Sequence, residues 1–322
     1  MVDFDMPLDQ LRAYRGNTPL PSDHQAFWDL SLEEARRHDP QARLVPGGPA
    51  STKVECFDVF FKGLDGSEIH AKVLRPRGAV GGPALFQFHG YTNDSGNWID
   101  KLSWAAEGFT VIALDCRGQA GRSMDASART GNSFLGHLVR GLSGASARDH
   151  IYWHIYTDIY LLTRVAKDLL KVDASRMASM GTSQGGGLAL ICASLEPGIV
   201  KVASQFPFLA NFKRSTELAY PRSPYQEVRE YFRKHDPEHL RAELIYTRFG
   251  YIDAIHLAPR IRAELLMAIT LEDDICPPSS QFAAYNQVSS AKQMALYPDY
   301  GHEDMLPGWH EKVWAFLGPL AR

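Results

Sequence analysis

The sequence is poor in the residues that disulfide frameworks and metal centres require. It holds four cysteines among 322 residues, and none of them belongs to a C-x-x-C pair. Cys116 and Cys192 stand inside apolar runs, which is typical of reduced, buried thiols and favours a cytoplasmic protein. No His, Cys and carboxylate residues follow one another at the spacing of metal ligands, so we expect no metal site.

Dense positive charge and long apolar segments are also lacking. The formal net charge is −3 and no block of Lys and Arg occurs, so we expect no nucleic-acid partner. The first residues, MVDFDMPLDQLRAYRG, are acidic and have no long apolar core, which predicts neither a signal peptide nor a membrane span. Without internal repeats or low-complexity linkers, the 322 residues are interpreted as a single domain with additions.

The first quarter of the chain differs in pattern from the rest. Residues 1 to about 50 form an extension rich in Pro and polar residues, with a helix predicted over 22–38. Ser22 and Gln25 have the spacing of a capping box at its start. Residues 53–76 alternate apolar and polar side chains across LDGSE, which predicts an antiparallel β-hairpin or meander at the edge of a sheet.

The remainder alternates short apolar runs with helical patterns. The predicted strands are 83–90, 109–118, 176–183, 200–208, 263–270 and 292–302, and the predicted helices include 98–107, 156–170, 184–195 and 279–288. Such alternation predicts an α/β fold whose mostly parallel central sheet is flanked by helices. Residues 211–259 show helices without strands, which indicates a helical insertion.

One serine stands at a predicted strand-to-helix turn. The segment GTSQG, residues 181–185, ends a strand and opens a helix, so that the Ser183 hydroxyl would stand above the edge of the sheet. This is the geometry of a nucleophile in the α/β-hydrolase fold. The alternative is a tight turn that only packs the helix closely against the strand.

A serine needs a base and an orienting acid to act as a nucleophile. His302 follows a predicted strand directly, whereas the other histidines after Ser183 do not: His235, His239, His256 and His310. Between Ser183 and His302 the carboxylates at a strand end are Glu272, Asp273 and Asp274, of which we favour Asp273 as the acid. The order Ser, Asp, His is the order of α/β-hydrolases.

The oxyanion of a tetrahedral intermediate needs hydrogen-bond donors. The backbone N–H of Gln184 is one, because it follows the nucleophile at a helix N-terminus. The loop after ALFQFHG should supply the other, which makes the amide of Tyr91 the candidate. We interpret the side chain of His89 as structural, holding this loop by hydrogen bonds.

Several motifs together resemble carbohydrate esterase family seven, the acetyl xylan esterases and cephalosporin-C deacetylases. The motifs are RGQ at 117–119, GTSQGGG at 181–187 and GHE at 301–303, with FHGY at 88–91 and PPSSQFAAYN at 277–286. The resemblance covers nearly the whole chain. It implies an α/β-hydrolase in which Ser183 is the nucleophile, His302 the base and Asp273 the acid.

The resemblance implies further properties. The amides of Tyr91 and Gln184 would form the oxyanion hole, and Arg117 and Gln119 would be framework residues that hold the loops. The substrates would be small acetate esters, such as acetylated xylo-oligosaccharides and cephalosporin C, with no cofactor. The chain would assemble as a hexamer, a trimer of dimers, with residues 53–76 resembling an interface segment.

Two segments follow the family only loosely, residues 120–154 and 212–228. Because these loops should shape the alcohol side of the pocket, the preference among acetylated substrates is left open. We hypothesise that Pro224 and Ile275 wall the acyl pocket and keep it near acetyl size. Two alternatives remain: a peptidase or thioesterase on the same fold, and a non-catalytic binding protein.

Overall fold

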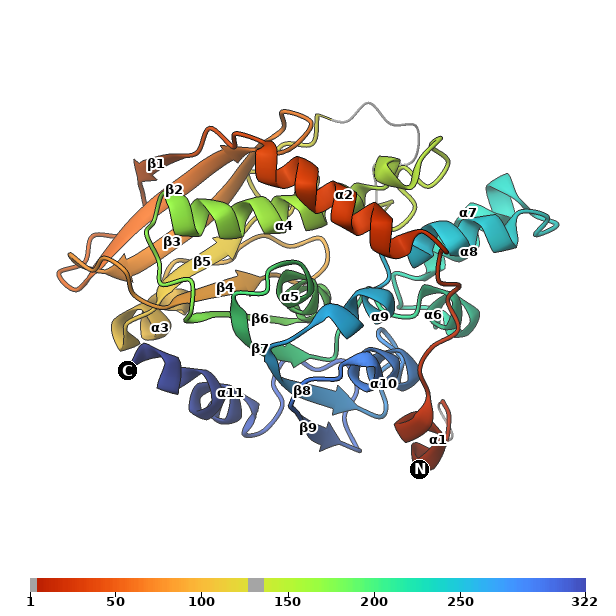
Figure 1. The fold of residues 1–322 in the computed structure, drawn as a ribbon. Coiled ribbons are helices and arrows are strands. Elements are labelled where there is room, and N and C mark those ends of the chain that lie inside the picture. The colour runs from red at the N-terminus through yellow and green to blue at the C-terminus, as the bar shows by residue number, and fades with distance from the viewer. Residues whose placement is uncertain (1–4, 127–135) are drawn as a thin grey trace.

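The computed structural model describes residues 5–126 and 136–322 (Figure 1). Within them, one sheet has the strand order β1-β2-β3-β5-β4-β6-β7-β8-β9. The strands are β1 (Arg43–Pro46), β2 (Val54–Lys62), β3 (Glu68–Pro76), β4 (Ala84–Phe88), β5 (Thr110–Leu114), β6 (Met177–Thr182), β7 (Ile199–Gln205), β8 (Glu264–Thr270) and β9 (Lys292–Tyr297). Strands β5, β4 and β6–β9 pair in parallel, which confirms the α/β prediction.

The predicted hairpin of residues 53–76 is present as β2 and β3, paired antiparallel in a continuous register from Val54↔Pro76 to Lys62↔Glu68. It does not form the edge of the sheet, because β1 pairs outside β2 and β3 joins β5. The prediction missed β1, since its four residues are mostly exposed and carry no apolar run.

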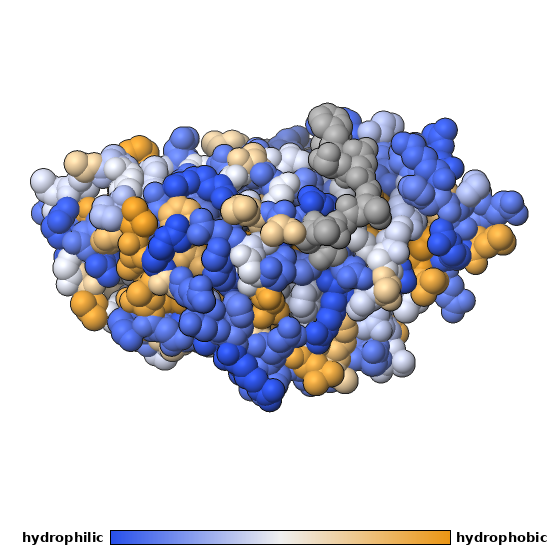
Figure 2. Space-filling view, turned by 90° about the horizontal axis from the view of Figure 1, so that it is seen from above, coloured by the Kyte–Doolittle hydropathy of each residue, from blue (hydrophilic) through white to orange (hydrophobic). Residues whose placement is uncertain are grey.

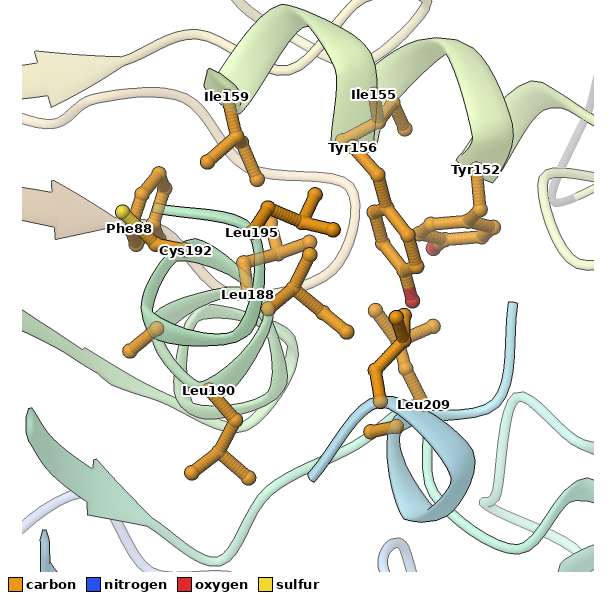
Figure 3. Close-up of a cluster of buried hydrophobic side chains, with 14 of the residues drawn as sticks. Phe88, Tyr152, Ile155, Tyr156, Ile159, Leu188, Leu190, Cys192, Leu195 and Leu209 are labelled. Carbon is orange, nitrogen blue, oxygen red and sulfur yellow. The ribbon is translucent and has the colours of Figure 1, made fainter. Parts of the chain in front are cut away.

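Helices cover both faces of the sheet (Figure 1). One face carries α2 (His24–Arg37), α4 (Ile151–Asp168), α5 (Gln184–Leu195) and α10 (Pro278–Gln287), and the other carries α3 (Leu102–Glu107) and α11 (Trp309–Leu317). Figure 3 shows Ile159 of α4 pointing towards Leu195 of α5, with Ile155 one turn away on the same helix. Residues four apart lie on the same face of a helix, so Ile155 and Ile159 belong to one apolar stripe of α4.

The starts of two helices differ from the predictions. α4 begins at Ile151, five residues before the predicted Tyr156, because α2 covers its outer side and buries the aromatic first turn. The side chain of His150 caps α4 by accepting a hydrogen bond from the backbone N–H of Tyr152. The capping box predicted for α2 is wrong: Asp23 is the N-cap without a side-chain cap bond, and Gln25 instead binds Asp29.

The chain between β7 and β8 is helical, as predicted for the insertion. It forms α6 (Phe212–Leu218), α7 (Gln226–His235), α8 (Ala242–Gly250), α9 (Ala254–Leu257) and the 3-10 turn η3 (Ala258–Arg260). In Figure 1, α7 and α8 project from the body of the molecule beyond the carboxyl ends of the parallel strands.

The N-terminal extension is bound to segments that are distant in sequence. After Asp5 come α1 (Leu8–Ala13) and α2, joined by an extended stretch. The carboxylate of Asp5 accepts from the N–H of Ser279 at 2.7 Å, and the indole N–H of Trp28 donates to the carbonyl of Tyr251 at 2.7 Å. The extension therefore ties α10 to the helical insertion.

The surface carries no long apolar element in the described part of the chain. No helix there combines the length and apolar character needed to cross a bilayer. Figure 2 shows one face of the molecule, on which apolar side chains stand in small separate groups among polar ones.

Candidate active site

Ser183 lies in a strained turn between β6 and α5. Its backbone has φ 58° and ψ −120°, a left-handed conformation that is strained for any residue other than glycine. The surrounding structure enforces it: the N–H of Ser183 donates to the carbonyl of Gln205 at 3.0 Å. A Cβ atom on Gly185 would collide with the carbonyl of Phe88, and one on Gly181 with the backbone of Gly185. Both glycines are thus required by close packing.

His302 joins Ser183 to Asp273. The His302 Nε2 lies 3.0 Å from Ser183 Oγ, and its Nδ1 lies 2.9 Å from Asp273 Oδ2. This network assigns the proton to Nδ1 and leaves Nε2 free to accept the serine proton. The three residues follow β6, β8 and β9, whose carboxyl ends meet at one edge of the sheet.

Asp273 is fully buried and held from several sides. Its Oδ1 accepts from the N–H of Ile275 at 2.9 Å and of Cys276 at 2.8 Å, and its Oδ2 accepts from the Gln281 amide at 3.1 Å. These donors fix the carboxylate towards His302. Asp274, the alternative acid, instead lies 3.7 Å from the guanidinium of Arg222.

Three side chains of the kinds that bind metal ions lie together at this site, although the spacing of these residues in the sequence did not predict a metal site. Ligand atoms of Asp273, Cys276 and His302 lie within 4.8 Å of one another. Metal binding needs a thiolate, and burial raises the pKa of Cys276 well above its usual value, which disfavours that form. The carboxylate and the imidazole are already hydrogen-bonded to each other. The donor set therefore fits proton transfer better than metal ligation.

Gln119 and Gln184 connect the two candidate oxyanion segments. Their side-chain amides bind each other reciprocally, at 2.9 Å and 3.1 Å. The Oε1 of Gln119 also accepts from the N–H of Thr92, directly after Tyr91, at 2.9 Å. Gln184 is fully buried, and its Oε1 accepts from the Tyr152 hydroxyl at 2.8 Å. One amide pair thus fixes the Tyr91 loop relative to the N-terminus of α5.

Arg117 lies away from the serine in a buried ion cluster. Its guanidinium makes two bonds to Asp158 of α4, at 2.7 and 2.8 Å, and one to Asp65 in the β2–β3 turn, at 2.7 Å. Burial raises the pKa of Asp158 to about 6, with Arg117 opposing the shift. Burial also acts on Asp65, but there the bond from Arg117 prevails and lowers the pKa to about 2. Arg117 therefore joins the hairpin to α4.

His89 has structural contacts on both ring nitrogens. Its Nε2 accepts from the N–H of Cys116 at 3.0 Å, and its Nδ1 donates to the carbonyl of Gly90 at 2.8 Å. Burial lowers the pKa of His89, so the ring is neutral. It ties the loop after β4 to the end of β5, as the sequence interpretation expected.

The structure brings the segments of Pro224 and Ile275 together. The hydroxyl of Ser223 donates to the carbonyl of Ile275 at 2.9 Å. Pro224 and Ile275 are both half-buried, the first in the insertion and the second in the loop that carries Asp273. The bond thus joins the insertion to the loop that carries Asp273.

Sequence reasoning missed two residues that hold the site. Gln205 ends β7, accepts from the Thr182 hydroxyl at 3.2 Å and donates to the carbonyl of Asp304 at 3.2 Å, which holds the His302 loop. Glu227 of α7 binds the hydroxyl of Tyr91. Gln205 could have been found by extending the search at strand ends to amides, whereas Glu227 stands in a helix and carries no local signal.

The geometry defines the class of this protein. A serine in a strained turn, with its His and Asp partners at the carboxyl ends of parallel strands, is the arrangement of the α/β-hydrolase fold. The family model for acetyl xylan esterase (AXE1) matches residues 1–320, and the chain belongs to this family. The resemblance noted from the motifs is thereby confirmed.

Two similar solved structures cover almost the whole chain. The crystal structure of acetyl xylan esterase 1 from Thermoanaerobacterium sp. JW/SL YS485 is 44% identical, with a TM-score of 0.94, over 98% of this chain and 99% of that chain. The acetyl xylan esterase from Paenibacillus sp. R4 is 35% identical, with a TM-score of 0.91 and the same coverage. The acetyl esterase Axe7A of Xylanibacter ruminicola is 22% identical over 295 residues, 88% of this chain, which spans 64% of that esterase.

Proposed function

We propose that this protein is a serine esterase that removes acetyl groups from small esters, acetylated xylo-oligosaccharides and cephalosporin C among them. The observation that carries the proposal is the continuous hydrogen-bonded series from Ser183 through His302 to Asp273. Membership in the acetyl xylan esterase family supports acetate as the acyl group, and favours an esterase over a peptidase, a thioesterase or a non-catalytic protein on this fold.

The first half of the reaction acylates the serine. Ser183 Oγ attacks the ester carbonyl carbon while His302 Nε2 takes its proton, and the Asp273 carboxylate stabilises the imidazolium. The carbonyl oxygen becomes an oxyanion that accepts hydrogen bonds from the backbone N–H groups of Gln184 and Tyr91. When the intermediate collapses, the bond to the alcohol oxygen breaks, and His302 returns the proton to this leaving group.

The second half releases acetate. Water attacks the acetyl-serine carbonyl while His302 takes a proton from the water. Collapse of the second tetrahedral intermediate breaks the bond to Ser183 Oγ, which regains its proton from His302. Acetate leaves, and the enzyme returns to its first state without a net change in protons on its side chains.

The acyl pocket proposed between Pro224 and Ile275 gives the test of this function. Purified protein should hydrolyse p-nitrophenyl acetate with a kcat/KM at least ~10-fold above that for the butyrate ester, since one or two methylenes are worth roughly 10–200-fold in a tight pocket. Ile275→Ala should narrow this ratio. Leu240→Ala, on the exposed turn between α7 and α8, is the matched control. If the protein releases acetate from neither p-nitrophenyl acetate nor acetylated xylobiose, the proposed function is contradicted.

We further propose the hexamer implied by the family resemblance, with the β2–β3 hairpin region at an interface. Size-exclusion chromatography with light scattering should give a mass six times that of one chain. Dilution should not shift this mass if the interfaces are large and apolar. A single species with the mass of one chain would contradict the assembly and leave the esterase proposal untouched.

A further inference from the structure

A single carboxylate joins the helical insertion to the Tyr91 loop. Glu227 is the second residue of α7. Its Oε1 accepts from the Tyr91 hydroxyl at 2.8 Å, and its Oε2 accepts from the backbone N–H of Leu138 at 3.3 Å. Both oxygens are therefore engaged by other segments of the chain. A negative charge in the first turn of a helix is also stabilised by the helix dipole.

The tyrosine side chain is held along its length. Its ring meets the edge of His137, with centroids 5.6 Å apart, and packs on Phe208 at 5.5 Å. At the backbone end, Gln119 binds the N–H of the adjacent Thr92. Contacts at the hydroxyl, the ring and the adjacent backbone thus couple the position of the Tyr91 side chain to that of its peptide unit.

We propose that Glu227 is a positioning residue for the oxyanion hole, holding the Tyr91 side chain so that its backbone N–H meets the developing oxyanion. The inference rests on the proposed function, in which that N–H is a donor. Oxyanion donors act only when they are already in place, and misplacements of about 1 Å cost up to ~100-fold in rate. The helical insertion thereby takes part in catalysis without touching the substrate.

Three titratable groups from other elements face Glu227: Tyr91 after β4, His137 beside Leu138, and Tyr152 of α4. On its own helix, Glu230 pairs with Arg233. Burial lowers the pKa of His137 and raises the pKa of both Tyr91 and Tyr152, so these groups are neutral near pH 7. Burial raises the pKa of Glu227 to about 7, opposed by the bonds from the Tyr91 hydroxyl and from the backbone of Leu138 and His137.

The direction of the pH effect follows from the hydrogen bonds. Above about pH 7, Glu227 is ionised and accepts from both the Tyr91 hydroxyl and the Leu138 N–H. Below it, one carboxyl oxygen carries a proton and loses one of these donors. The positioning effect is therefore present at high pH and lost as the pH falls through 7. A glutamine keeps one accepting oxygen but presents an N–H to the second donor.

The test compares Glu227→Gln, Tyr91→Phe and the double variant on p-nitrophenyl acetate. At about pH 8 each single variant should lower kcat roughly 10-fold with KM changed less than ~2-fold, because a misplaced donor acts on the transition state. At about pH 6 the difference between the wild type and Glu227→Gln should shrink. The double variant should be no slower than either single one, since both changes break the same contact.

Two variants on α7 serve as matched controls. Glu230→Gln breaks a largely exposed ion pair one turn further on, and Tyr231→Phe removes a hydroxyl bonded to Ser143. Both should keep wild-type kcat. A wild-type kcat for Glu227→Gln at pH 8, an equal loss at both pH values, or additive effects in the double variant would each overturn the inference. Ser183→Ala tests the proposed function separately, because it does not involve Glu227.

Discussion

Alanine in place of Ser183 is expected to lower kcat for p-nitrophenyl acetate by about 10⁴- to 10⁶-fold, which is the loss seen when a member of such a triad is removed. The reason is that no other described hydroxyl lies within hydrogen-bonding distance of His302 Nε2. Cys276 lies beside the serine, but its raised pKa keeps the thiol from acting as a substitute.

The stability of the same variant separates catalysis from folding. The hydroxyl of Ser183 bonds to the partly exposed His302 and contacts the thiol of Cys276, so loss of this one small group should keep the midpoint temperature of thermal unfolding within a few degrees of the wild type. His302→Gln combined with Ser183→Ala should be no slower than Ser183→Ala alone, because the triad acts as a unit. Nitrophenol release by Ser183→Ala at the wild-type rate would remove the serine from the mechanism.

Methionine in place of Arg117 is expected to lower the free energy of unfolding by about 3–5 kcal/mol, the usual cost of removing one partner of a buried ion pair. Arg117 and Asp158 are both fully buried, and Asp65 stands at the other side of the guanidinium. Without the cation, the buried carboxylate of Asp158 loses its partner and stands near the partly exposed carboxylate of Asp65. Urea unfolding followed by fluorescence measures the loss.

The loss of stability in Arg117→Met should depend on pH, in a direction that follows from the pKa of Asp158. The pKa of Asp158 is already raised to about 6, and loss of Arg117 raises it further. A raised folded pKa means that the carboxyl group favours the folded state below about pH 4 and that this contribution disappears as the pH rises through the folded pKa. The deficit of Arg117→Met should therefore be larger at pH 8 than at pH 5.

A control on an exposed ion pair completes the experiment. Arg148 of the turn before α4 pairs with Glu34 of α2, and both side chains are more than a third exposed. Arg148→Met should change stability by less than about 1 kcal/mol at either pH. A deficit for Arg117→Met that is equally small, or that grows towards pH 5, would show that the buried cluster does not depend on its cation.

The three residues of the proposed triad could be selected from the sequence because parallel sheets bring strand ends together. Ser183, Asp273 and His302 each follow an apolar run that ends at the same edge of the sheet, so a search of strand ends finds them. The choice of Asp273 over Asp274 agrees with its contact to His302. The tight turn was also visible, since glycines on both sides of a serine at a strand-to-helix junction indicate close backbone packing.

The residues that support the proposed triad and the Tyr91 loop could not be found in this way. Arg117 and Asp158 lie 41 residues apart, and Tyr91 and Glu227 lie 136 apart. Their pairing depends on how α4 and α7 are oriented, which helical periodicity does not specify. The start of α4 was predicted too late for a related reason. Its first turns are buried on all sides, so they lack the alternation of polar and apolar faces by which a helix is recognised in a sequence.

The N-terminal extension has a consequence for how the chain reaches its folded state. Asp5 binds Ser279, which is synthesised 274 residues later, and Trp28 binds Tyr251, 223 residues later. At a synthesis rate of about 5–20 residues per second, the delay between such partners leaving the ribosome is roughly 10–55 s. During that interval strands β1 to β7 are already available to pair, whereas Asp5 and Trp28 still lack these two partners, so both contacts form only after most of the sheet has been synthesised.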